Sequence, residues 1–172
     1  MTLHHRRQRH LYGCMYHALY ALSGDEAWLE HAEDVSRLRW LTRLHAAGLG
    51  VLTYFTDIVT DQTVPPGFWE ALRGLAADSA VTHLPLLLTI EGNSGFARHV
   101  VAVALPVRET DPVIVSDSGR DGLLHLTYPE FLESVYGRAY EVETLAPADL
   151  ELYPFESGAE YASRTDAAPY LM

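Results

Sequence analysis

The chain has 172 residues, 48% of them hydrophobic, and a formal net charge of −11. This length fits one domain with a substantial core, and an acidic chain whose 12 basic residues are all arginines is unlike a nucleic-acid binder, which needs positive charge to neutralise phosphates. Because Cys14 is the one cysteine, the chain forms no internal disulfide and no cysteine-rich zinc module.

Helices are expected in most of the first half of the chain. Apolar residues at helical spacing predict helices over residues 14–22 and 34–47, with Asp34 as the cap of the second helix. A short helix is expected over residues 25–31, and another helix follows Pro65-Pro66.

Strands are expected mainly in the second half. Runs rich in Leu, Val, Ile and Thr predict them over residues 51–55, 85–91, 99–107, 113–117, 123–126 and 140–145. The capping box Thr127-x-x-Glu130, with Pro129 in the first turn, predicts a helix that runs to about Tyr136. We therefore expect an α+β fold in which N-terminal helices pack on a four- to five-stranded antiparallel sheet.

The last part of the chain has a different composition. Seven acidic residues and one arginine, Arg164, follow position 140, and the apolar periodicity ends near Leu145. We expect a main folded domain over residues 1–145 and an acidic C-terminal extension over residues 146–172.

Neither a membrane span nor an export signal is expected. No window approaches the ~18 consecutive apolar residues that cross a bilayer. The basic and then apolar segment 1–24 is interrupted by Gly13 and His17 and has no small-residue cleavage pattern. We expect a cytoplasmic protein that makes no membrane contact, and export by a signal-free route stays open.

Cys14 is the candidate nucleophile. It is expected at the start of a helix, where the helix dipole and the backbone N–H groups of the first turn stabilise a thiolate. Such a nucleophile also needs a base, a group that orients the base, and a donor to the oxyanion of the tetrahedral intermediate.

Three other residues can take these roles. His99 begins a strand after a glycine-containing loop and is the candidate base. Asp117 ends the next strand, and the intervening hairpin brings it toward His99, whose N–H it can accept. Gln8, six residues before Cys14, is the candidate oxyanion donor together with the Cys14 backbone N–H.

The segments around these residues support the same assignment. Gln8-x5-Cys14 is followed by Met-Tyr-His-Ala-Leu-Tyr-Ala-Leu, Leu84-Pro85-Leu-Leu-Leu precedes His99-Val-Val-Ala-Val, and Val113-Ile-Val-Ser-Asp117-Ser-Gly precedes Leu126-Thr-Tyr-Pro-Glu-Phe-Leu-Glu133. In this order they resemble the papain-like cysteine peptidases, specifically the bacteriocin-processing peptidase domains of ABC transporters and their free-standing bacterial relatives.

The resemblance covers most of residues 8–145. It implies a papain-like fold with Gln8 as the oxyanion glutamine, Cys14 as nucleophile, His99 as base and Asp117 as its partner. The chain differs from the usual family pattern at Gly13-Cys14-Met15, where Asp-Cys-Gly is common, at Arg98, where glycine is common, and at Ser118, where proline is common.

Two other interpretations concern nearby histidines. His17 shares a helix face with Cys14 and is an alternative base, but we expect it to pack under the site or face solvent because no orienting partner is evident. A metal site made of Cys14, His17, His10 and His99 has no recognised ligand spacing, so we expect no metal and no cofactor. We expect the histidine- and arginine-rich segment 4–10 to be a solvated terminus.

The leading functional hypothesis is a cysteine peptidase or hydrolase that acts on a peptide or protein through a Cys14 thioester. A protein-glutamine deamidase or transglutaminase would use the same chemistry. A catalytically silent papain-like module that binds a peptide is the third hypothesis, although such a module has no need of a thiol beside an imidazole base. The peptide substrate and the oligomeric state stay open.

Overall fold

The computed structural model describes residues 1–9, 13–32, 37–57, 60–93 and 98–147. In chain order its elements are α1 (Cys14–Ser23), η1 (Glu26–His31), α2 (Arg37–Ala46), β1 (Leu49–Thr56), α3 (Phe68–Ala76), β2 (His83–Glu91), β3 (Arg98–Pro106), β4 (Val113–Ser116), β5 (Leu124–Leu126), α4 (Tyr128–Glu133) and β6 (Glu141–Pro147). The predicted Asp34 cap, His10 and the acidic extension from residue 148 onward lie outside the described residues.

The strands form one antiparallel sheet in the order β1-β6-β2-β3-β4-β5. The α+β prediction is therefore confirmed, whereas the expected count of four to five strands was wrong because the sheet has six. The sixth strand is β1, which pairs along its length with β6 from Leu49↔Pro147 to Thr56↔Glu141. This ladder places β6, the last of the described strands, between β1 and β2.

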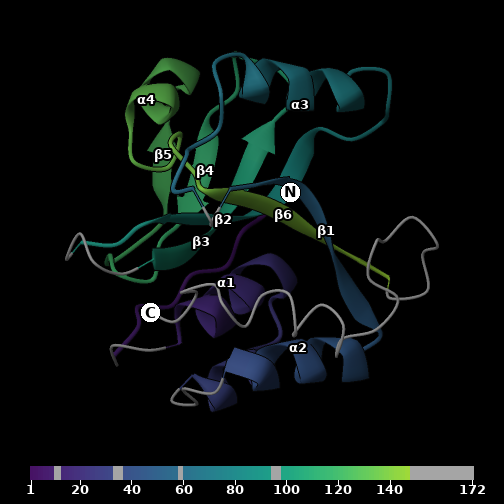
Figure 1. Cartoon of the computed structure of the whole chain (residues 1–172), viewed down its shortest axis with the longest axis vertical. Coiled ribbons are helices and arrows are strands. Elements are labelled where there is room, and N and C mark those ends of the chain that lie inside the picture. Colours follow the sequence, from purple (N-terminus) through teal and green to yellow (C-terminus); the bar gives the residue numbers. More distant parts are fainter. Residues whose placement is uncertain (10–12, 33–36, 58–59, 94–97, 148–172) are drawn as a thin grey trace.

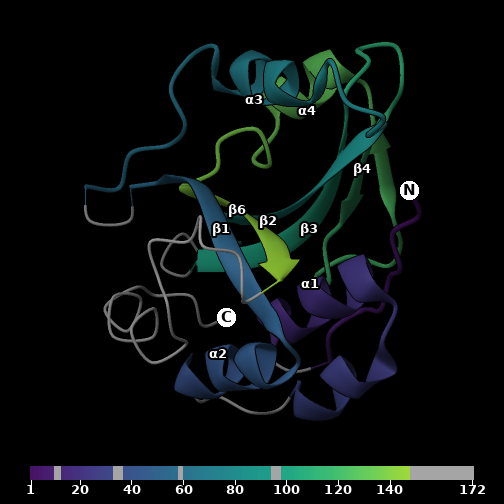
Figure 2. The same cartoon turned by 90° about the vertical axis from the view of Figure 1, so that its right-hand side faces the viewer.

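Helices cover both faces of this sheet. Figures 1 and 2 show α1 and α2 on one face and α3 and α4 on the other. The sequence of β3 explains how one strand serves both layers. Its side chains alternate, so Val100 and Ala102 join the core with α1, while Val101 and Val103 join the core with α3 and α4. The expected N-terminal helical layer is present, and a second layer lies opposite it.

Local signals at the helix ends are mostly as expected. Thr127 accepts from the Glu130 N–H, and the Glu130 carboxylate accepts from the Thr127 N–H, which confirms the capping box. The helix ends at Glu133 rather than near Tyr136. The segment Glu26–His31 is a 3-10 helix that begins at the Asp25 cap. None of the helices in the described residues is long and apolar enough to span a lipid bilayer.

The first nine residues pack along the domain. Leu3 is buried, the His4 N–H donates to the Ala21 carbonyl of α1, and the Gln8 N–H donates to the Ser118 carbonyl after β4. His5 is half-buried, with its ring nitrogens bonded to the Ser116 hydroxyl and the Arg120 carbonyl. The solvated-terminus prediction was wrong for His5 and for the backbone, which joins α1 to the end of β4. It is confirmed for the exposed side chains of His4, Arg6, Arg7 and Arg9.

Candidate active site

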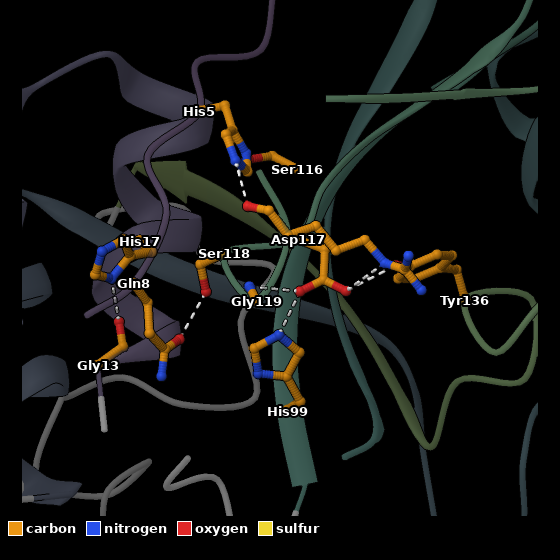
Figure 3. A network of polar contacts seen from close by, with 11 residues as sticks. His5, Gln8, Gly13, His17, His99, Ser116, Asp117, Ser118, Gly119 and Tyr136 are labelled. Carbon is orange, nitrogen blue, oxygen red and sulfur yellow. Dashed lines mark hydrogen bonds and ion pairs between the residues drawn. The ribbon is translucent and has the colours of Figure 1, made fainter. Parts of the chain in front are cut away.

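The two catalytic candidates on the sheet lie at the same end of neighbouring strands. His99 is the second residue of β3, Asp117 follows β4, and the register Ala102↔Ser116 brings these positions together. His99 Nε2 lies 2.8 Å from Asp117 Oδ1 (Figure 3). The hairpin thus delivers the pair that the sequence indicated.

Asp117 is held through both of its carboxylate oxygens. Oδ1 also accepts from the Gly119 N–H at 2.9 Å, and Oδ2 accepts from the Tyr136 hydroxyl at 2.7 Å. The Arg120 Nε donates to that hydroxyl at 3.1 Å and lies 3.8 Å from Asp117 Oδ2. Because the side chain is buried and every partner is a donor, the carboxylate is fixed in orientation and in charge.

The charges of this pair follow from these contacts. Burial by itself would raise the pKa of Asp117, but the hydrogen bond and charge of His99 and the donors Tyr136 and Gly119 lower it to about 2. Burial by itself would lower the pKa of His99, but the hydrogen bonds to Asp117 and Cys14 and the charges of both groups raise it to about 10. At neutral pH the pair is therefore an imidazolium and a carboxylate.

Cys14 completes the chain of contacts. It is the first residue of α1, its side chain is buried, and it is a hydrogen-bond partner of His99. Because Nε2 of the imidazole is bonded to Asp117, Nδ1 is the nitrogen that remains for the hydrogen bond with the Cys14 thiol. The thiol therefore lies at the N-terminus of α1 and beside the imidazole of His99.

Gln8 lies beside Ser118, the residue after Asp117. The Ser118 hydroxyl donates to Gln8 Oε1 at 2.7 Å, and the Gln8 backbone N–H donates to the Ser118 carbonyl at 2.8 Å. Figure 3 shows the carboxamide oxygen turned to Ser118 and its nitrogen turned away. The amide nitrogen is thus the end that is presented as a donor, as an oxyanion hole requires.

The residue before the nucleophile has a strict conformational requirement. Gly13 is the N-cap of α1 with φ +106°, and a Cβ there would lie 2.1 Å from the Ala32 carbonyl oxygen. A side chain at position 13 is therefore excluded, including the aspartate that is common there in the peptidases that the sequence resembles. Gly13 also brings no capping side chain to the first N–H groups of α1.

His17 is buried beneath the site. Its Nδ1 donates to the Gly13 carbonyl at 2.9 Å, and its pKa is lowered, chiefly by burial. The prediction that it packs under the site is confirmed. A neutral imidazole whose Nδ1 is held by a backbone carbonyl is poorly suited to be the base, and His99 already has the orienting carboxylate.

A pocket of about 270 Å³ opens beside His99 and Asp117. Its other lining residues are Ile90, Glu91, Gly92, Asn93, Arg120, Val135 and Tyr136. It therefore opens to the imidazole between the C-terminal end of β2 and the loop after α4. In the described part of the chain, no group of three or more His, Cys, Asp or Glu side chains is arranged to hold a metal ion.

Three contributors to this site were not found from the sequence. Tyr136 lies in the loop after α4, and only the folded chain brings its hydroxyl to Asp117, as it does for Arg120. Ser118 was visible as a departure from the family pattern, but its bond to Gln8 was not. The one sequence signal that could have indicated the role of Ser118 is its place as a polar residue next to the candidate Asp117.

The comparisons with known proteins add no assignment. No protein-family model matches the sequence, and no curated protein matches it.

Proposed function

We propose that the protein is a cysteine peptidase or related amide hydrolase of papain-like type, acting on peptides or proteins. The observation that carries this proposal is the continuous set of contacts from Cys14, at the start of a helix, to His99 and Asp117. Gln8 is bonded to Ser118, the residue after Asp117. A binding module needs none of these contacts, whereas covalent catalysis needs all of them.

The first half of the reaction forms a thioester. The Cys14 thiolate attacks the carbonyl carbon, and the Gln8 amide and the Cys14 backbone N–H stabilise the oxyanion. When this intermediate collapses, the C–N bond breaks and the His99 imidazolium gives its Nδ1 proton to the leaving amine. Asp117 keeps the ring in the orientation that aims Nδ1 at the reacting atoms.

The second half releases the product. Neutral His99 takes a proton from water, which attacks the thioester carbonyl, and the Cys14 thiolate leaves as the carboxylic acid forms. The imidazolium and thiolate are thereby restored.

The first experiment is alkylation of Cys14 by iodoacetamide at pH 7, followed by intact mass. We expect the wild-type protein to react at least about tenfold faster than His99→Gln, because an ordinary thiol is only a few per cent thiolate at this pH. His99→Gln has the same cysteine in the same buried place, so the comparison is independent of access. Equal rates would rule out an activated thiol.

The second experiment identifies the reaction. The protein is incubated with a peptide library, with and without a small primary amine, and the products are analysed by mass spectrometry. Chain cleavage supports the hydrolase, whereas glutamine-to-glutamate conversion or amine incorporation would replace it by a deamidase or transglutaminase. Products that persist with Cys14→Ala, or none with the wild type, would overturn the proposal, the latter in favour of a binding module.

A further inference from the structure

Each of the two proposed oxyanion donors belongs to an amide group. The oxygen of each amide group accepts a hydrogen bond from another side chain. One is the Gly13–Cys14 peptide, which offers the Cys14 N–H, and the other is the Gln8 carboxamide. In a peptide group the C=O and N–H lie in one plane and point in opposite directions. A bond that fixes the oxygen therefore also fixes the direction of the N–H.

His17 fixes the first of these oxygens. Its imidazole Nδ1 lies 2.9 Å from the Gly13 carbonyl oxygen, which also accepts the His17 backbone N–H at 3.1 Å. Because a carbonyl can only accept, Nδ1 carries the hydrogen. Gly13 has a left-handed backbone and no side chain, so these two bonds are what orient its carbonyl.

Ser118 fixes the second oxygen, Oε1 of the Gln8 carboxamide. Its hydroxyl donates to Gln8 Oε1 at 2.7 Å, and its carbonyl accepts from the Gln8 backbone N–H at 2.8 Å. Ser118 is 3% exposed, so both contacts are shielded from competing water. The two bonds hold the main chain and the side chain of Gln8 against the same residue.

We propose that His17 and Ser118 are positioning residues that aim the two donors of the oxyanion hole. This inference rests on the proposed function. It assigns a role to a histidine that is not the base and to a serine that is not a nucleophile. Neither touches the reacting atoms, because each acts through the oxygen of another amide.

The test uses two probes that differ in one respect. Acylation by p-nitrophenyl acetate passes through a tetrahedral oxyanion, whereas alkylation by iodoacetamide takes place at a saturated carbon and forms none. Orientation of the donors therefore affects the rate with the first probe and not the rate with the second.

The variants are His17→Leu, His17→Asn and Ser118→Ala. Asparagine is the informative replacement, because its Nδ2 stands as many bonds from Cα as the imidazole Nδ1 and leucine has a similar shape without the donor.

We expect His17→Leu and Ser118→Ala each to slow acylation about 10- to 100-fold, because a single oxyanion donor is worth about 10²- to 10³-fold when it is lost entirely. The alkylation rate should stay at the wild-type value. His17→Asn should recover most of the acylation rate. His45→Leu is the matched control, because it removes an exposed histidine from another helix and should change neither probe.

The outcomes separate this inference from the proposed function. If the wild type shows no Cys14-dependent acylation and no His99-dependent alkylation, the proposed function fails. If the wild type reacts with both probes but His17→Leu and Ser118→Ala acylate at its rate, only the positioning role fails. Equal slowing of both probes, or no recovery with His17→Asn, would also reject it, because the effect would then reach the thiolate or the fold.

Discussion

The candidate site has two halves that are built by different means. The helix half comprises Gln8, Gly13, Cys14 and His17, and the sheet half comprises His99, Asp117 and Tyr136. In the sheet half, strand register and hydrogen bonds to the Asp117 carboxylate hold the candidate base, His99. In the helix half, neutral amide groups are held by hydrogen bonds to their oxygens, two to the Gly13 carbonyl and one to Gln8 Oε1.

This difference separates two kinds of effect. The sheet half sets protonation, because its contacts move the pKa of His99 to about 10 and that of Asp117 to about 2. The amide groups of the helix half set geometry, because amide groups do not titrate. Changes in the sheet half should therefore move pH profiles, and changes to these amide groups should alter rates at unchanged pH dependence.

The largest effect is expected from Asp117→Asn. Turnover should fall about 10²- to 10⁴-fold, because the imidazole loses its orienting carboxylate. Asp117 raises the pKa of His99, so its removal lowers that pKa and the alkaline limb of the turnover profile should move about one to two pH units toward neutrality. A pH series of steady-state rates measures both.

The control for this variant is Asp121→Asn, which removes an exposed carboxylate paired with Arg7. It should leave the rate and the alkaline limb in place. If Asp117→Asn lowered the rate without moving the limb, the sheet half would act by geometry alone and the contrast between the halves would be lost.

The next effect is expected from Gln8→Ala. Acylation should slow about 10²- to 10³-fold, because one donor to the oxyanion is lost. The pH profile should keep its shape, and iodoacetamide alkylation of Cys14 should be unchanged. The chain's other glutamine, Gln62, is exposed and gives the matched control Gln62→Ala. A shifted pH profile in Gln8→Ala would show that the helix half also sets charge.

The fold was predictable where the signal was local. The central strands β2 and β3 are nearly continuous apolar runs, and the Thr127 capping box marks its own helix. The place of β1 was not predictable, because its partner Glu141 lies 85 residues from Thr56 and no local pattern encodes that pairing. The second helical layer was missed for the same reason.

The candidate site shows the same limit. Cys14, His99 and Asp117 were recognised because each stands at the end of an element that the sequence marks. Gln8 was recognised by its spacing of six residues before Cys14. Tyr136 was missed, since it lies in a loop and its contact with Asp117 depends on how α4 docks. Gly13 was read as a departure from a pattern, and only the position of the Ala32 carbonyl shows why glycine is required.

Gly13→Ala tests the geometry of the helix half through stability. The unfolding free energy should fall by about 3 kcal/mol, because alanine must accept a positive φ and its Cβ meets the Ala32 carbonyl. Gly48→Ala is the matched control, since Gly48 has φ +74° with nothing within 4 Å of a Cβ, and should cost about 1 kcal/mol. Urea unfolding measures both, and equal losses would contradict the close approach to Ala32.

The smallest effect is expected from Tyr136→Phe, in the sheet half. Turnover should fall about tenfold or less, because the hydroxyl supports Asp117 indirectly and Arg120 stays near the same carboxylate oxygen. The lost hydrogen bond raises the pKa of Asp117 above about 2. Asp117 stabilises the fold when ionised, a contribution that is present above its ordinary pKa and lost as pH falls through the folded value.

That loss should therefore be smaller in Tyr136→Phe than in the wild type and complete at a higher pH, because it ends at the folded pKa. Urea unfolding between about pH 5 and pH 2 measures it. Tyr54→Phe is the control, because the Tyr54 hydroxyl is half-buried and has no hydrogen-bond partner in the part of the chain that the structure describes. If both variants kept the acid profile of the wild type, Tyr136 would not contribute to the charge of Asp117, and the sheet half would be reduced to His99 and Asp117.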